Sequence, residues 1–176
     1  EHWWMKDLPM DDWVNYQAEF LKGEYHITTH RKPVVQDPYR SKIDVKEFSD
    51  GWFVPTMPDL NQRNEFMGTY LLQNSIWWIE YADLKGIRMD TYPYPDMDYL
   101  SKWSCDVMNE YPNFNIVGEE WYEQPAVVAH WQKGKESATG HDSCLPSLMD
   151  FPLQSAFIKS LNDDRGWDVW VDAYAM

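Results

Sequence analysis

The amino-acid sequence predicts an α/β domain built around a parallel β-sheet. Helical and strand-like segments alternate after about residue 63, and each connection between two expected strands contains one helix. A chain of 176 residues, 44% hydrophobic and 25% charged, is long enough for one domain with a sizeable core. This alternation fits both a closed barrel and an open doubly wound sheet. The first two expected strands lack a following glycine-rich phosphate loop, which disfavours a nucleotide-binding open sheet.

The first part of the chain, residues 1–63, has little periodicity. Five prolines interrupt it, and short β segments are expected only at 25–29 and 51–54. A stretch of this length without regular structure is unusual in a compact domain and is typically functional.

The regular part begins with a helix over 64–83, where bulky apolar residues recur at helical spacing. A short strand follows at 87–90. A second helix is expected over 96–110, with an acidic N-cap at its first residue, and a second strand over 115–119.

The last elements are a helix that starts near Pro125, a strand over 147–151 and a helix over 153–161. Cys105 and Cys144 are the only cysteines, and the sequence leaves open whether they pair. The compartment also stays open, with a periplasmic or secreted location favoured over a cytoplasmic one.

Charge excludes two classes of partner. The chain has 29 acidic and 15 basic residues and a formal charge of −14, so it repels nucleic acids and anionic membranes. A neutral ligand such as a carbohydrate is compatible with this charge. Aromatic residues make up 16% of the chain; their rings either stack on sugars or fill the core and its rim.

Two carboxylates are expected side by side at one edge of the sheet. Side chains alternate along a strand, so Arg88 and Asp90 share one face, and Glu119 ends the next strand. Parallel neighbours place their carboxyl ends together. Arg88 compensates the charge of Asp90 where both are buried, and it lowers the pKa of that carboxyl. Such a pair suits glycoside hydrolysis, although ordinary polar residues at strand ends would give the same pattern.

Three segments resemble motifs of the α-amylase family. The segment 86–90, Gly-Ile-Arg-Met-Asp, is similar to the block in which an arginine precedes the nucleophilic aspartate by two residues. The segment 117–121, Val-Gly-Glu-Glu-Trp, is similar to the block that carries the acid/base glutamate. The segment 57–61, Met-Pro-Asp-Leu-Asn, resembles the block near the end of the family's B domain in the neopullulanase and cyclomaltodextrinase branch. Their order and spacing also match.

The resemblance implies a (β/α)8 TIM barrel. Residues 1–63 would form the B-domain insertion after barrel strand three, and residues 64–176 would supply strands four to six with their helices. It implies a retaining hydrolase of α-glucans such as starch, maltooligosaccharides, pullulan or cyclodextrins. In it Asp90 is the nucleophile, Glu119 the acid/base, and Arg88 orients Asp90.

Two further family motifs do not occur in the 176 residues, so the segment is expected to lack activity without the rest of the parent enzyme chain. The family often binds calcium, which makes calcium a candidate cofactor, but neither a residue cluster for it nor a required cofactor is evident. The five histidines have no tight metal-ligand spacing and are expected at the surface; they are His2, His26, His30, His130 and His141.

Aromatic residues beside the two carboxylates are candidates for sugar binding. Tyr92 follows Asp90, and Trp121 and Tyr122 follow Glu119. Packing in the core or at its rim explains them equally well. The alternative to an enzyme is a non-catalytic carbohydrate-binding protein that uses such rings for stacking.

Overall fold

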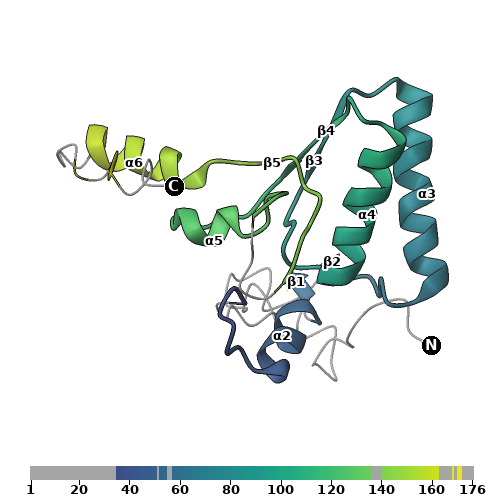
Figure 1. Cartoon of the computed structure of the whole chain (residues 1–176), viewed down its shortest axis with the longest axis horizontal. Helices are drawn as coiled ribbons and strands as arrows, with labels where there is room; N and C mark the ends of the chain where they lie inside the picture. Colours follow the sequence, from purple (N-terminus) through teal and green to yellow (C-terminus); the bar gives the residue numbers. More distant parts are fainter. Residues whose placement is uncertain are drawn as a thin grey trace, which may run out of the picture.

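The computed structural model describes residues 35–50, 52–54, 57–135, 140–162, 168, 170 and 171. The expected β segment at 25–29 and the histidines His2, His26 and His30 lie outside these residues. Figure 1 shows two long helices side by side along a small sheet, with a last helix that extends away from it. The elements in chain order are α2 (Lys42–Ser49), β1 (Trp52–Val54), β2 (Met57–Pro58), α3 (Glu65–Ala82), β3 (Gly86–Met89), α4 (Met97–Glu110), β4 (Asn115–Gly118), α5 (Pro125–Ala129), β5 (Ser147–Leu148) and α6 (Phe151–Asn162).

The central sheet has three parallel strands in the order β3-β4-β5, as the alternation of helices and strands predicts. Met89 at the end of β3 is opposite Gly118 at the end of β4, and Gly118 is in turn opposite Leu148 of β5. This register brings the carboxyl ends of the three strands to one edge. The short strands β1 and β2 form a separate antiparallel pair near that edge (Figure 1).

Capping residues set the bounds of the two long helices. Asn64 accepts hydrogen bonds from the amides of Phe66 and Met67 at the start of α3, and Asp83 ends that helix in the left-handed region at φ 50°. Asp96 is the predicted N-cap of α4 and accepts from the amide of Tyr99 at 3.0 Å. Both helices therefore match the sequence-based prediction within one residue.

The core lies between the sheet and the helices. On α4 an apolar stripe is buried through Leu100, Trp103 and Val107, and these pack with Ile116 of β4 in one cluster. The apolar side chains of β3 pack against the same cluster, as the alternation along that strand predicts. The polar side chains therefore lie on the opposite face of β3.

The aromatic residues of α3 differ from the expected core stripe. Five of them are between 47% and 76% exposed: Phe66, Tyr70, Trp77, Trp78 and Tyr81. Trp77 and Tyr81 stack on one another instead, with ring centroids 4.7 Å apart. Helical periodicity identified the helix correctly but did not identify which of its faces meets the sheet.

The last strand is shorter than predicted. It ends at Leu148, and Phe151 already begins α6. Asp150 causes this change, because its carboxylate accepts a hydrogen bond from the amide of Leu153 and so starts the helix. The prediction of a strand through residue 151 is therefore wrong in its last residues.

A disulfide bond joins Cys105 of α4 to Cys144, with 5.1 Å between the Cα atoms. The sequence leaves open whether these cysteines pair, and the structure shows that they do. The bond connects the segment before β5 to α4. Across the described residues, we find no helix of the length and hydrophobicity that a membrane span requires.

Candidate active site

Arg88 joins the two predicted catalytic carboxylates. Its Nη1 lies 2.8 Å from Oδ2 of Asp90, and its Nη2 lies 2.8 Å from Oε1 of Glu119. The two acids come from the ends of neighbouring parallel strands, and the guanidinium group lies between them. The sequence predicts this pairing of Asp90 with Glu119 at one edge of the sheet.

Backbone contacts hold Glu119 just beyond the end of β4. Its amide donates to the carbonyl of Met89 at 2.9 Å, which extends the sheet pairing by one residue. Its Oε2 accepts from the amide of Thr91 at 3.0 Å. Glu119 is only 7% exposed, so these contacts satisfy a carboxylate that is otherwise removed from water.

Thr91 follows the candidate nucleophile in a strained conformation. Its φ is +47°, a region that β-branched residues rarely adopt. This turn points the Thr91 amide at Glu119, and strain of this kind is concentrated at functional sites. Nothing in the sequence points to Thr91, because a threonine carries no signal for a positive φ.

Gly118 allows the close packing beneath Glu119. A Cβ atom at this position would lie 2.7 Å from Cδ2 of Leu145 and 3.1 Å from Cγ of Tyr92. Both neighbours are buried, at 0% and 1% exposure. A side chain at residue 118 would therefore displace the strand end that carries Glu119.

Electrostatics favour an ionised Asp90. The hydrogen bond from Arg88 lowers the pKa of the Asp90 carboxyl most, and a hydrogen bond with Glu119 lowers it further. In return the carboxylates raise the pKa of Arg88. The side chains of Arg88 and Asp90 are 47% and 65% exposed, so the expectation that this pair is buried is not met. The three-stranded sheet leaves their face open to solvent.

The aromatic candidates separate into two groups. Trp121 is 76% exposed and stacks on Phe151 with ring centroids 4.9 Å apart, and Tyr122 is 42% exposed. Tyr92 is only 1% exposed, and its hydroxyl group lies 3.1 Å from Oγ of Ser104. An enclosed ring has no free face for a sugar, so the structure places Tyr92 in the core.

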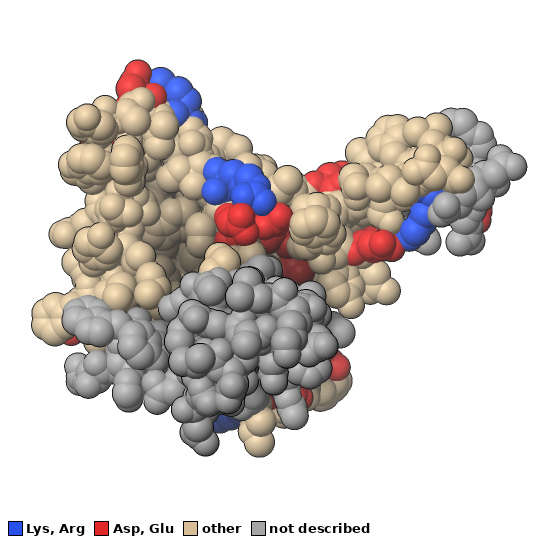
Figure 2. All heavy atoms as spheres, turned by 180° about the vertical axis from the view of Figure 1, so that it is seen from behind, with Lys and Arg blue, Asp and Glu red and all other residues tan. Residues whose placement is uncertain are grey.

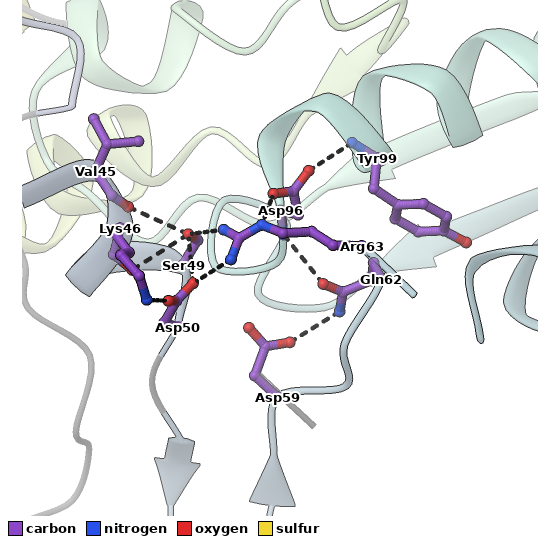
Figure 3. A network of polar contacts seen from close by, with 9 residues as sticks. All are labelled: Val45, Lys46, Ser49, Asp50, Asp59, Gln62, Arg63, Asp96 and Tyr99. Carbon is purple, nitrogen blue, oxygen red and sulfur yellow. Dashed lines mark hydrogen bonds and ion pairs between the residues drawn. The ribbon is translucent and has the colours of Figure 1, made fainter. Parts of the chain in front are cut away.

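A second polar cluster lies near the start of α4 (Figure 3). Arg63 donates to Oδ1 of Asp50 and to Oδ2 of Asp96, each at 2.7 Å, and to Oγ of Ser49 at 3.0 Å. The side chain of Asp50 is only 3% exposed and also pairs with Lys46. Arg63 thus connects the C-terminal end of α2 to the N-cap of α4 through hydrogen bonds and ion pairs.

Asp59 lies beside that cluster as a largely buried acid. Its Oδ1 accepts from Nε2 of Gln62 at 2.9 Å, and its Oδ2 has no hydrogen-bond partner among the described residues. Burial, together with the charges of Asp50 and Asp96, raises the pKa of Asp59 to about 7. Nothing in the sequence indicates this shift in the pKa of Asp59.

His130 and His141 are half-buried, which corrects the expectation of surface histidines. Their rings stack 5.6 Å apart, and Ser101 Oγ lies 3.4 Å from Nε2 of His141. Burial lowers the pKa of His130 to about 4 and that of His141 in the same direction. The described part of the chain has no group of three or more metal-ligating side chains, so the calcium that the resemblance implies has no assigned site there.

Solved structures define the class of fold. The chain matches the α-amylase from Geobacillus thermoleovorans, determined in complex with acarbose, with a TM-score of 0.54 and 26% identity over 74% of this chain and 26% of that one. It matches an Anoxybacillus α-amylase with a TM-score of 0.55 and 26% identity over 90% of this chain and 32% of that one. The described sheet and helices are therefore consistent with a fragment of the TIM barrel of these enzymes.

Curated relatives match most of the chain in sequence. The chain is 27% identical over 147 residues to a cyclomaltodextrinase of Thermoanaerobacter pseudethanolicus and 30% identical over 142 residues to the intracellular maltogenic amylase of Bacillus subtilis. These alignments cover 84% and 81% of this chain, and it spans 20% of the length of either relative. No family model matches the chain. The predicted resemblance to the α-amylase family is confirmed, because the homologues of this chain are α-amylase family glycosidases.

Proposed function

We propose that this chain carries the catalytic acids of a retaining glycosidase that acts on α-glucans. The single observation that carries the proposal is the bridge from Arg88 to both Asp90 and Glu119, 2.8 Å on each side. Two carboxyls that contact one guanidinium group are close together, which favours the short separation of a retaining enzyme over the wide one of an inverting enzyme.

Asp90 is the nucleophile in this proposal. Arg88 lowers the pKa of its carboxyl, so the ionised form that must attack the anomeric carbon predominates. Attack breaks the glycosidic bond and joins the sugar to Asp90. The exposure of Asp90 leaves its carboxylate accessible to a substrate.

Glu119 is the acid/base. It donates a proton to the leaving oxygen and then takes a proton from the water that releases the sugar from Asp90. Its contacts with the amide of Thr91 and with Arg88 fix its direction in both steps. Trp121, one of the exposed rings beside it, is a candidate platform for a neighbouring sugar, and Tyr122 is another.

The remaining assignments follow from the proposed place of this segment in a barrel. Strands β3, β4 and β5 would be barrel strands four to six, and residues 1–63 would form the inserted B domain. A segment that spans 20% of its relatives supplies only part of a substrate cleft. We therefore expect the isolated 176-residue chain to hydrolyse starch, pullulan and cyclodextrins negligibly.

A non-catalytic carbohydrate-binding role is the second candidate. The exposed stack of Trp121 on Phe151 favours it, because such rings bind sugars without any chemistry. The two roles differ in whether a covalent sugar adduct forms.

A mechanism-based glycosyl fluoride separates the two roles. In the full-length protein, mass spectrometry of a peptic digest should find the sugar on the peptide that contains Asp90. The Asp90→Asn variant is the matched control and should stay unlabelled. Binding of maltooligosaccharides without any labelling would support the non-catalytic role instead.

A further inference from the structure

A polar cavity lies apart from the Arg88 bridge, at the start of α4. Its volume is about 440 Å³, within the usual range for small-ligand sites. Four segments line it: α2 with a residue before it, Arg63 before α3, the start of α4 with its N-cap, and residues 140–142. Because α4 begins seven residues after Asp90, the start of α4 lies near the edge of the sheet that carries the catalytic pair.

Contacts within the protein hold part of the cavity lining in place. Arg63 is held by Asp50 and Asp96 (Figure 3). The segment 140–142 is tied to α4 by the adjacent disulfide bond and by the contact of His141 with Ser101. Fixed polar groups lower the cost of ordering a site on binding.

The lining selects the chemical class of the ligand. It contains two arginines and three aspartates, so neither an anion nor a cation meets a surface of opposite charge. Its apolar side chains are limited to Val45 and Met97, which disfavours a hydrophobic ligand. Among the described residues no three ligating groups are arranged for a metal ion. A ligand that both donates and accepts hydrogen bonds without carrying charge fits best.

We propose that this cavity is a binding subsite for a glucan unit, separate from the catalytic pair. Hydroxyl groups of the sugar donate to the carboxylates of Asp98 and Asp142 and accept from the guanidinium group of Arg40. Burial lowers the pKa of His141, and Arg40 lowers it further, against the opposite effect of Asp98 and Asp142. The neutral ring that this favours also hydrogen-bonds to hydroxyl groups. The choice of a glucan rests on the proposed function; the preference for an uncharged polyol rests on the lining itself.

Charged side chains are unevenly distributed over one face of the molecule. Figure 2 shows a face on which most of the described surface is neither basic nor acidic, with the charged side chains gathered at a few places.

The test uses two variants of the cavity in the full-length protein, each made with Glu119→Gln so that substrate is not consumed. Asp98→Ala removes an acceptor, and Ser101→Phe fills the space. Glu110→Ala and Asn109→Phe make the same changes at the far, exposed end of α4 and serve as matched controls. Melting curves confirm that each variant folds.

Calorimetric titration with maltoheptaose should show a dissociation constant about tenfold higher for the two cavity variants and unchanged for the controls. Maltose, which is too short to occupy both sites, should lose less affinity. Equal maltoheptaose affinity in all folded variants would overturn the subsite. Cleavage by the protein without Glu119→Gln tests the proposed function separately, so active enzyme with unaffected cavity variants refutes the subsite alone.

Discussion

The amide of Thr91 donates a 3.0 Å hydrogen bond to Oε2 of Glu119. The residue after the proposed nucleophile therefore orients the proposed acid/base, in addition to the bridge through Arg88. Asp90 and Glu119 are thus coupled twice, once through a side chain and once through the backbone. Changes to either link should affect both acids together.

Replacement of Arg88 should affect catalysis much more than folding. Arg88→Lys keeps the charge but loses the planar fork that reaches both carboxylates, so we expect kcat of the full-length protein on maltooligosaccharides to fall roughly 10²-fold. Lys85→Ala is the control, because Lys85 forms an exposed pair with Asp83. An Arg88→Lys enzyme with near-normal kcat would show that the bridge is not part of the machinery.

The two carboxylates should respond differently to azide. Glu119→Ala lacks the proton donor, so an activated aryl glycoside should still form the covalent intermediate, and azide should release a product of retained configuration. Asp90→Gly lacks the nucleophile, so azide should attack directly and give the inverted product. NMR of the two glycosyl azides checks the assignment. The opposite stereochemistry would reverse the two roles.

Stability should depend on pH through Asp59. The folded protein raises the pKa of this carboxyl from 3.8 to about 7, so the folded state binds the proton more tightly than the unfolded chain. The free energy of unfolding therefore falls as pH rises from about 4 to about 7, where the buried carboxylate becomes charged beside Asp50 and Asp96 with only Arg63 and Gln62 to compensate it.

Asp59→Asn imitates the protonated carboxyl and tests this directly. We expect the variant to be more stable by about 1–3 kcal/mol above pH 7 and nearly unchanged below pH 4. Denaturant unfolding at both pH values measures the difference. If the substitution lowered the free energy of unfolding by the same amount at both pH values, the packing of Asp59 would matter for stability and its charge would not.

The Cys105–Cys144 disulfide should stabilise the segment before β5. It closes a sequence separation of 39 residues, for which a loss of about 2–4 kcal/mol is expected in the double serine variant. Denaturant unfolding with and without reductant measures it. Reductant should destabilise the original protein and leave the double variant unchanged, whereas insensitivity of both would contradict a stabilising role.

The sequence by itself was sufficient for most elements of the regular part and for the prediction that Asp90 and Glu119 lie side by side. Alternation along β3 separates Arg88 and Asp90 from the apolar face, and the common direction of parallel strands brings Glu119 beside them. These features follow from local periodicity and from motif spacing, both of which are present in a linear chain.

Only the tertiary structure decided the features that depend on long-range packing. Helical periodicity on α3 could not show that Trp77 faces solvent, because that depends on which face meets the sheet. The burial of Tyr92 against Gly118 and the pairing of Cys105 with Cys144 each require neighbours that the sequence places far away, and the raised pKa of Asp59 requires its burial in the folded protein. Burial and desolvation are properties of the folded surroundings and not of a residue type, so no local pattern encodes them.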